Sequence, residues 1–263
     1  MQPSLSFIED LARQAGAVLR DGYGQQHQVH HKGVIDLVTE VDHQSEALII
    51  AGLRQAFPDH CIITEESGHL TGDSEHCWYI DPLDGTLNYA HALPFFCVSM
   101  AYARQGEVQL AVVYEPQRDE CFSAEKGAGA WLNGQPIQAA ETTELIDSLL
   151  VTGFPYDLLS SEMHNIDYFG YFSRRSQGVR RLGSAALDLC YVAAGRLDGY
   201  WELSIKNWDI AAGVLIAREA GALVSKIDGD ADTLKPPLTI LAATPALYPQ
   251  LLEVLQKDIS KLR

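Results

Sequence analysis

The chain has 263 residues, enough for one large domain or for two fused domains that share a core. Its hydrophobic content of 47% and charged content of 21% are ordinary for a globular protein. The formal net charge of −16 argues against general nucleic-acid binding, because no basic excess is available to replace phosphate counterions. An acidic protein that binds an anion needs locally inverted charge, which a bound divalent cation provides.

The N-terminus, the apolar runs and the cysteines predict a cytoplasmic protein that has no association with membranes. No apolar run approaches the roughly 20 residues that span a bilayer. The segment from Met1 to Ser4 lacks a basic region followed by an apolar core, so no secretory signal is visible. The five cysteines are an odd number and contain no Cys-x-x-Cys pair, which favours reduced core thiols. They are Cys61, Cys77, Cys97, Cys121 and Cys190.

The first third of the chain predicts helices and strands in alternation. The elements in chain order are a helix over 5–20, a turn over 32–42, a helix over 41–56, a strand over 61–67, a polar loop over 68–75 and a strand over 77–83. Ser4 or Ser6 is a candidate N-cap of the first helix. The histidines His27, His30 and His31 are interpreted as a solvated segment. The alternative is a metal site, but no acid or cysteine partners them at a recognisable spacing.

Residues 95–132 predict an antiparallel meander. Two apolar, β-rich runs flank a hairpin turn at 104–107, and Asn133-Gly134 is a strong turn sequence. The polar segment 140–147 interrupts this pattern. We therefore expect an N-terminal α+β half over residues 1–145 and a C-terminal α/β half over residues 146–263.

The second half predicts strands and helices in irregular alternation. The strands are 149–154, 179–183, 198–203, 222–227 and 238–243, and the helices are 158–176, 184–195, 208–221 and 246–257. Ser184 is the expected N-cap of the helix that Gly195 stops. Irregular alternation with one antiparallel block favours an α/β (mixed α+β) layered sandwich with mixed sheets.

The strand over 77–83 ends at two carboxylates, Asp81 and Asp84. Pro82 between them has a fixed φ and no N–H to donate, so we expect the backbone to leave the sheet there. Gly85 and Thr86 follow, where a helix or tight turn can begin and point unpaired N–H groups outward. The pair predicts a combined metal and phosphate site, because Mg²⁺ prefers carboxylate and carbonyl oxygens. The alternative is a plain surface turn, since Asp, Pro and Gly dominate turns.

Four carboxylates share one kind of position, at the end of an apolar strand or the start of a helix. They are Glu65, Asp81, Asp84 and Asp209. Each one alone fits a turn or cap residue. Together they favour convergence on a common edge of the fold.

Three ordered motifs resemble the signatures of the inositol monophosphatase family. They are Glu65-Glu66, Asp81-Pro82-Leu83-Asp84-Gly85-Thr86-Leu87-Asn88-Tyr89 and Trp208-Asp209-Ile210-Ala211-Ala212-Gly213. That family belongs to the Mg²⁺-dependent, lithium-sensitive phosphatases, with fructose-1,6-bisphosphatases and nucleotide 3′-phosphatases. The resemblance runs from Lys32 to Gly221. It implies a sugar-phosphatase-like α-β-α-β-α sandwich, a homodimer and inhibition by lithium.

The resemblance also implies two or three Mg²⁺ ions per active site. Glu65, Asp81 and the backbone carbonyl of Leu83 would hold the first ion. Asp81, Asp84 and Asp209 would hold the second, and Glu65 would hold a weaker third ion through waters. Two such ions lower the pKa of a bound water and stabilise the entering and leaving oxygens of a displacement.

The implied catalytic residues are Glu65, Thr86 and Asp42, of which Asp42 and Thr86 match the pair that orients the attacking water. The implied substrate-binding residues are Asp84, Gly85, Thr86, Gly183, Ser184, Ala185, Glu202 and Asp209. Gly85 and Thr86 would offer backbone N–H groups to the phosphate. Glu202 matches a glutamate that binds an inositol hydroxyl, and a carboxylate accepts hydrogen bonds from hydroxyls. Its alternative is an exposed acid at a strand end.

The expected reaction is hydrolysis of a small phosphate ester, myo-inositol monophosphate, to the free alcohol and inorganic phosphate. The same chemistry could act on fructose 1,6-bisphosphate, histidinol phosphate or 3′-phosphoadenosine 5′-phosphate. Arg174, Arg175, Arg180 or Arg181 could bind a second phosphate; the other interpretations of these arginines are a solvated face and a subunit contact. A further alternative is a regulatory or RNA-associated role in addition to catalysis. The overall acidity argues against direct RNA contact but allows a protein partner.

Overall fold

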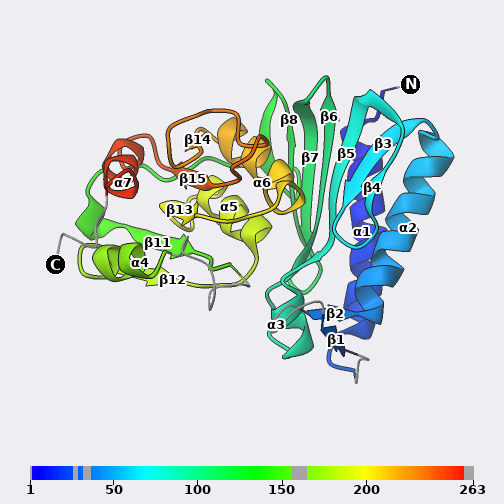
Figure 1. Cartoon of the computed structure of the whole chain (residues 1–263), viewed down its shortest axis with the longest axis horizontal. Coiled ribbons are helices and arrows are strands. Elements are labelled where there is room, and N and C mark those ends of the chain that lie inside the picture. Colours follow the sequence, from blue (N-terminus) through cyan, green and yellow to red (C-terminus); the bar gives the residue numbers. More distant parts are fainter. Residues whose placement is uncertain (1, 26–28, 32–36, 156–164, 258–263) are drawn as a thin grey trace.

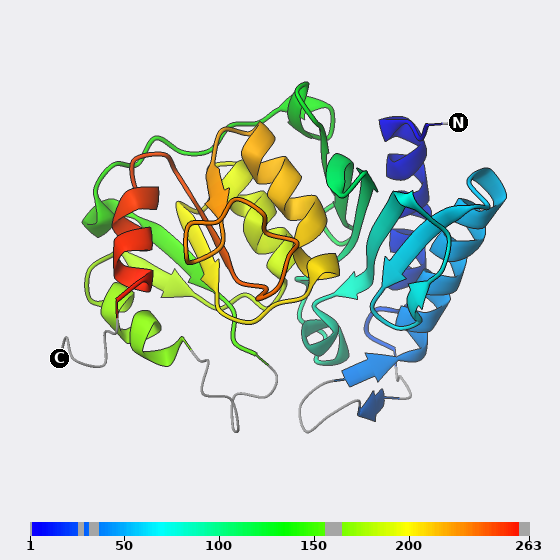
Figure 2. The ribbon, with the colours of Figure 1, turned by 45° about the horizontal axis from the view of Figure 1, so that its top comes forward.

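The computed structural model describes residues 2–25, 29–31, 37–155 and 165–257, and its helices and strands form five layers (Figure 1). One outer helical layer consists of α1 (Leu5–Gly22) and α2 (Glu40–Ala56), and the other consists of α4 (Ile166–Ser173) and α7 (Tyr248–Leu255). The central helical layer consists of α5 (Ala185–Ala193) and α6 (Asn207–Glu219). Two mixed sheets separate them, so the predicted layered sandwich is confirmed. Helices α1 and α7 lie at opposite ends of the molecule in both views (Figures 1 and 2).

The first sheet has eight strands in the order β10-β9-β8-β7-β6-β5-β3-β4. Their bounds are β3 (His60–Thr64), β4 (Gly68–Leu70), β5 (Asp73–Asp84), β6 (Cys97–Arg104), β7 (Glu107–Glu115), β8 (Glu120–Glu125), β9 (Gly129–Leu132) and β10 (Gln135–Pro136). Only β3 and β5 are parallel. Strands β6 to β9 form the antiparallel meander predicted over 95–132, with its hairpin turn between β6 and β7, and β5 and β10 extend it on either side.

The second sheet has five strands in the order β12-β11-β13-β15-β14. Their bounds are β11 (Leu149–Thr152), β12 (Gly178–Arg180), β13 (Gly199–Glu202), β14 (Leu223–Ser225) and β15 (Ile240–Ala243). Strand β11 runs parallel to both of its neighbours, and the remaining pairs are antiparallel. The remaining elements are the two-stranded pair β1 (Val29–His31) and β2 (Leu37–Thr39), the short helix α3 (Thr86–Ala90) and the 3₁₀ turn η1 (Leu145–Asp147).

Three predicted elements differ from the structure. The loop predicted over 68–75 is wrong, because β4 and the start of β5 lie there; β4 is an edge strand, so its sequence is polar without being a loop. The expectation that the chain leaves the sheet at Pro82 is also wrong, because β5 pairs again at Asp84 with Cys97 after an irregular step. Pro82 falls within that step, where its missing N–H costs no ladder hydrogen bond. Helix α4 ends at Ser173, before the predicted end at residue 176, and residues 158–164 of the predicted longer helix lie outside the described residues.

The helix N-caps and the cysteines are as the sequence predicts. Ser4 caps α1 by accepting a hydrogen bond from the backbone N–H of Phe7, and Ser184 caps α5. All five cysteines are buried and free, which confirms the prediction of reduced core thiols. His27 lies outside the described residues, so the interpretation of the histidine cluster stays a prediction. Within the described part of the chain, no helix is long and apolar enough to cross a lipid bilayer.

The central core draws residues from both predicted halves. It combines side chains of β6, β7 and β8, such as Val113 and Phe122, with side chains of α5 and α6, such as Leu189 and Ile216. The boundary predicted at residues 145 and 146 falls within η1. Helix α6 therefore packs against the first sheet although it lies between strands of the second sheet, β13 and β14, in the chain, and this brings its N-terminus to the end of β5.

Candidate active site

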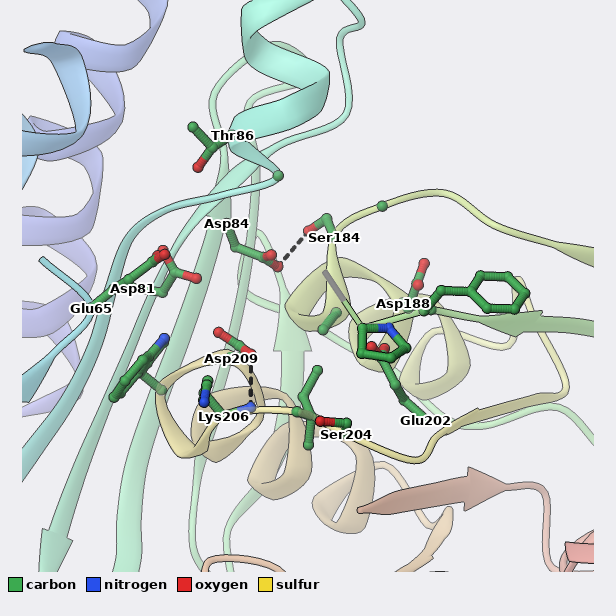
Figure 3. Close-up of a pocket in the computed structure, with 18 of the residues that line it drawn as sticks. Glu65, Asp81, Asp84, Thr86, Ser184, Asp188, Glu202, Ser204, Lys206 and Asp209 are labelled. Atoms are coloured by element: carbon green, nitrogen blue, oxygen red, sulfur yellow. Dashed lines mark hydrogen bonds between the residues drawn. The ribbon is translucent and has the colours of Figure 1, made fainter. Parts of the chain in front are cut away.

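A pocket of about 370 Å³ opens where the end of β5 meets the N-termini of α3, α5 and α6 and the end of β13 (Figure 3). The residues that line it include eleven of the twelve predicted site residues: Glu65, Asp81, Leu83, Asp84, Gly85, Thr86, Gly183, Ser184, Ala185, Glu202 and Asp209. The twelfth, Asp42, is fully buried, and its Oδ1 lies 3.1 Å from Thr86 Oγ1. The structure thus brings the whole predicted set together, whereas the role of each residue stays a prediction.

The end of β5 folds back on itself to form one wall of the pocket. The backbone N–H of Leu83 donates to Asp81 Oδ1 at 3.0 Å, which fixes the carboxylate beside the chain. The carbonyl of Pro82 accepts a hydrogen bond from Ser45 Oγ at 2.8 Å, which ties this strand end to α2. Both Asp81 and Asp84 are buried. A rigid strand end therefore carries two of the four carboxylates.

Gly85 makes the turn from β5 into α3. Its φ is +95°, a left-handed conformation, and a Cβ here would lie 2.9 Å from the carbonyl oxygen of Phe95, so only glycine fits. The turn places Thr86 Oγ1 2.9 Å from the Leu83 carbonyl oxygen and 3.1 Å from Asp42 Oδ1. The single hydroxyl proton can serve one of these acceptors at a time.

Asp42 belongs to the first turn of α2, where it forms a capping box with Thr39. The backbone N–H and the hydroxyl of Thr39 donate to Asp42 Oδ2 at 2.9 and 2.6 Å. This leaves Asp42 Oδ1 directed at Thr86. A helix cap thus orients a carboxylate behind the pocket.

Glu65 lies in the turn that follows β3, which a buried glutamate of α2 holds in place. Glu46 Oε1 accepts hydrogen bonds from Thr64 Oγ1 at 2.6 Å and from the backbone N–H groups of Glu66 and Ser67 at 3.1 Å. Sequence reasoning missed Glu46, because an acid on an amphipathic helix gives no indication that it is buried.

The N-terminus of α5 binds Asp84. Ser184 Oγ donates to Asp84 Oδ2 at 2.6 Å, and the backbone N–H of Ala186 donates to the same oxygen at 2.8 Å. Gly183, with φ of +90°, makes the turn that precedes this cap. Asp84 therefore joins the first sheet to the central helices across the pocket.

Asp209 is the third residue of α6, and its Oδ2 accepts a hydrogen bond from the backbone N–H of Lys206 at 2.9 Å. Trp208, which precedes it, offers its carbonyl oxygen to Ser99 Oγ on β6 at 3.5 Å. The helix start is thus held both by its own cap and by the first sheet. Figure 3 shows Asp209 facing Asp84 across the pocket.

Burial and mutual repulsion raise the pKa values of these carboxylates. The pKa of Asp81 is raised well above its usual range by burial and by the negative charges of Glu65, Asp84 and Asp209. Burial, Asp84 and Glu65 likewise raise the pKa of Asp209. Burial raises the pKa of Asp84 to about 6, although hydrogen bonds from Ser184 and the α5 backbone oppose that shift. A cation among these groups would relieve their repulsion.

The donor set of the pocket fits a hard divalent cation in its chemistry. Carboxylate and carbonyl oxygens are the ligands that Mg²⁺ prefers, and no ion pair among the described residues neutralises Asp81, Asp84 or Asp209. The positions of the side chains do not yet match a metal site: within the described ranges, no group of three or more His, Cys, Asp or Glu side chains is arranged to hold a metal ion. Carboxylate side chains would therefore have to rotate when an ion binds.

Glu202 ends β13 at the other side of the pocket and is only 6% exposed, so the alternative of an exposed acid is wrong. Tyr200 donates its hydroxyl to Glu202 Oε2 at 2.7 Å. Gly153 lies against the same carboxylate, which a Cβ at that position would overlap. Burial raises the pKa of Glu202 to about 7, while the Tyr200 hydrogen bond and Arg181 lower it.

The pocket also contains residues that sequence reasoning missed. They include Gly153, Phe154, Asp188, Ser204 and Lys206. Asp188 follows the predicted cap Ser184 by one helical turn, and this spacing was the one indication that both side chains face the same way. Arg174, Arg175 and Arg180 are exposed and lie outside the pocket, which agrees with a solvated face for them, whereas Arg181 is exposed and also lines the pocket.

Comparison with known proteins gives consistent matches along the chain. A sequence model described as "Inositol monophosphatase family" matches residues 1–260. The "Inositol-1-monophosphatase" of Synechocystis sp. is 48% identical over 230 residues, which cover 87% of this chain and 80% of the relative. The "Nus factor SuhB" of Escherichia coli K12 is 42% identical over 265 residues, with 99% and 98% coverage.

Solved structures of similar proteins share the fold. The inositol monophosphatase from Anabaena (Nostoc) sp. superimposes with a TM-score of 0.87 at 42% identity, covering 98% of this chain and 97% of that one. An "IMPase/NADP phosphatase complexed with Mg2+ and phosphate" superimposes with a TM-score of 0.81 at 25% identity, covering 96% of this chain and 95% of that one.

Proposed function

The chain belongs to the inositol monophosphatase family, a family of phosphatases, and we therefore propose that it hydrolyses the phosphate monoester of a small polyol, above all myo-inositol monophosphate. One observation carries this proposal: a single pocket holds four carboxylates at one side and the buried Glu202 at the other. The first side suits cations and phosphate, and the second suits hydroxyl groups. A polyol phosphate has both parts.

Mg²⁺ is the proposed cofactor, with two or three ions per site. Glu65, Asp81 and the Leu83 carbonyl would hold one ion; Asp81, Asp84 and Asp209 would hold another; Glu65 would hold a third through waters. When bound, the ions would neutralise the phosphate charge and lower the pKa of a water. The raised pKa values of the buried carboxylates support a cation here, as does the similar protein that is described in complex with Mg²⁺ and phosphate.

The chain's own residues position the phosphate and the attacking water. The Gly85 turn presents the N–H groups of Gly85 and Thr86 to the phosphate oxygens. Thr86 Oγ1, with the Asp42 carboxylate behind it, orients the water. Ser184 and the backbone of Ala186 orient Asp84 through hydrogen bonds to its Oδ2. Phosphoryl transfer asks mainly for such positioning and for charge neutralisation.

Substrate selection is assigned to the side of the pocket where Glu202 lies. Gly183, Ser184 and Ala185 line the wall between that side and Asp84. Arg181 at the rim would favour a substrate with a second phosphate, which keeps fructose 1,6-bisphosphate and 3′-phosphoadenosine 5′-phosphate as alternative substrates of the same chemistry. Histidinol phosphate, which has one phosphate, is an alternative that does not depend on Arg181.

A phosphate-release screen over sugar, polyol and nucleotide esters, with Mg²⁺ and with a chelator, tests the proposal. We expect the highest kcat/KM on myo-inositol 1-phosphate, loss of activity on chelation, and inhibition by millimolar Li⁺. If inositol phosphate were the poorest ester by orders of magnitude, the substrate assignment would be wrong. Activity unchanged by the chelator would contradict the assignment of the metal.

The variant Asp84→Asn tests the carboxylates. It should lower kcat/KM by a factor on the order of 100 to 1,000, because one anionic ligand and its charge are lost. Asp198→Asn is the matched control: Asp198 is also 8% exposed, but it binds the backbone of Leu149 away from the pocket. Comparable losses in both variants would show a defect of folding rather than of the site.

A second candidate function is association with the transcription machinery, since the Escherichia coli relative is named a Nus factor. The net charge of −16 favours a protein partner over direct RNA contact. Asp84→Asn separates the two roles, because a cellular phenotype that survives this substitution would not depend on catalysis.

A homodimer is also proposed, and light scattering tests it.

A further inference from the structure

A second buried carboxylate faces the pocket beside Glu202. Asp188 lies on α5, one turn after the cap Ser184, and is only 2% exposed. It lines the pocket together with Glu202. Figure 3 shows Asp188 and Glu202 on the same side of the pocket, across from Glu65 and Asp81. Two carboxylates therefore flank the region where the alcohol part of a substrate would lie.

One oxygen of Asp188 has no protein partner. Among the described residues, no group lies within hydrogen-bonding distance of Asp188 Oδ1, although that atom is fully buried. Buried polar atoms are nearly always hydrogen-bonded, so each exception requires an explanation. Two other buried side-chain atoms in the described part of the chain share this condition, Asn165 Oδ1 and Trp201 Nε1, but neither residue lines the pocket. Of these three residues, Asp188 is thus the one in the pocket wall, where rotation of its carboxylate about χ2 would turn the unpaired oxygen toward a ligand.

The surroundings of Asp188 suit a neutral ligand group with a hydroxyl. Asp84 and Glu202 place negative charge near it, and Arg181 places positive charge near it. A second anion such as phosphate would meet two carboxylates, which disfavours it. An alcohol hydroxyl donates to an ionised carboxylate and accepts from a protonated one, so it satisfies Oδ1 in either state.

We propose that Asp188 is a specificity-determining residue that hydrogen-bonds a hydroxyl of the substrate, next to the hydroxyl bound by Glu202. The pocket would then recognise two neighbouring hydroxyls of a polyol with two carboxylates. This proposal rests on the proposed function, since it assigns a contact within the same phosphatase site.

The test compares two esters with purified wild type, Asp188→Ala and Asp188→Asn in the presence of Mg²⁺. The esters are myo-inositol 1-phosphate and p-nitrophenyl phosphate, whose leaving group carries no further hydroxyl. We expect Asp188→Ala to raise KM for the inositol ester about 10- to 100-fold, with a smaller effect of Asp188→Asn. The kcat/KM for p-nitrophenyl phosphate should stay within about twofold of wild type.

Asp198→Asn is the matched control for removal of a buried acid, and it should leave the ratio of kcat/KM between the two esters unchanged. Asp188→Asn keeps the shape of the side chain, and its melting temperature shows whether the fold is intact. Equal losses on both esters would overturn the proposal, because Asp188 would then act on the phosphate side or on folding. Unchanged kinetics on both esters would also overturn it. A wild type that hydrolyses neither ester would overturn the proposed function itself, which is a different result.

Discussion

Two neighbours determine the orientation of the Glu202 carboxylate, one by a hydrogen bond and the other by its small size. The Tyr200 hydroxyl donates to it, and Gly153 leaves the space that its carboxylate fills. The carbonyl of Gly153 in turn accepts a hydrogen bond from Asn165 Nδ2 at 2.6 Å, and this bond restrains the Gly153 backbone from moving away from Glu202. The orientation of one carboxylate thus depends on the absence of a single methyl group.

Gly153→Ala should therefore displace Glu202. We expect KM for a polyol phosphate to rise about tenfold, with a loss of stability of about 1–3 kcal/mol from overpacking. Steady-state kinetics and urea unfolding measure both effects. Gly170→Ala on α4 is the control, since a Cβ there meets nothing within 4 Å; it should gain about 0.5–1 kcal/mol and keep its kinetics. Unchanged KM in Gly153→Ala would contradict the assigned role of Glu202.

The pKa of Glu202 also predicts a pH dependence of stability. Its folded value of about 7 exceeds the ordinary value of 4.5, so the folded protein binds this proton more tightly than the unfolded chain. The resulting stabilisation is fully present below pH 4.5 and is lost as the pH rises to about 7; the shift of about 2.5 pH units corresponds to roughly 3 kcal/mol at most.

Glu202→Gln removes this proton. With a chelator present to remove metal ions, the free energy of unfolding of the wild type should fall more steeply between pH 4.5 and 7 than that of the variant. Urea titrations at pH 4.5 and pH 8 give the difference. Equal pH dependence in the two proteins would show that Glu202 titrates normally.

The residues of the site differ in how far the sequence revealed them. Glu65, Asp81, Asp84 and Asp209 are visible because each interrupts or ends an apolar run. Asp188 is not, because it lies between leucines in a buried helix, and only the packing of α5 shows that this position faces a pocket.

At the scale of elements, the caps of α1 and α2 look alike in sequence but differ in what they position. Ser4 accepts a hydrogen bond from the backbone of Phe7 and serves its helix alone. Thr39 caps α2 and also donates to Asp42, which contacts Thr86. The cap of α2 is therefore connected to the pocket through Asp42 and Thr86, whereas the contact of Ser4 with Phe7 stays within α1.

Thr39→Ala and Ser4→Ala therefore form a matched pair. Each should cost about 1 kcal/mol of stability, the usual effect of losing an N-cap hydroxyl. Only Thr39→Ala should also lower kcat, because Asp42 loses the partner that orients it. Chemical denaturation and initial rates measure the two effects. Equal kcat in the two variants would contradict the link between the α2 cap and Asp42.

The strands show where sequence periodicity is informative and where it is not. Apolar runs identified β3, the core of β5 and the meander, because buried strands need such side chains. Strand β4 has no strand-like apolar pattern because an exposed edge lets a strand be polar. Residues 73–76 of β5 lack the pattern for another reason: they form the solvent-exposed start of an interior strand. The sequence alone predicts a strand end at Pro82, because the renewed pairing of β5 beyond the irregular step depends on β6.

At the scale of the whole molecule, the two sheets and the central helical layer between them share a core to which both predicted halves contribute. Side chains of β6 to β8 pack directly against α5 and α6. Local patterns predicted the layers, but they could not show this sharing, because it depends on contacts between residues about 100 positions apart.

The shared core predicts that the chain unfolds in a single step. Calorimetry should give one transition, with a calorimetric enthalpy close to the van't Hoff value. Ile216→Ala, which removes a fully buried side chain of α6 from that core, should lower the whole transition and cost about 2–5 kcal/mol. Two separate transitions, of which only one shifts in this variant, would show that the halves unfold independently.

The pocket takes Asp81 and Asp84 from one half and Glu202 and Asp209 from the other, with η1 as the link between them. Two polypeptides made by severing the chain at that link would each be inert, and hydrolysis would return only when they reassemble. The enzyme could then report on the proximity of two fusion partners, because its chemistry belongs to neither fragment alone.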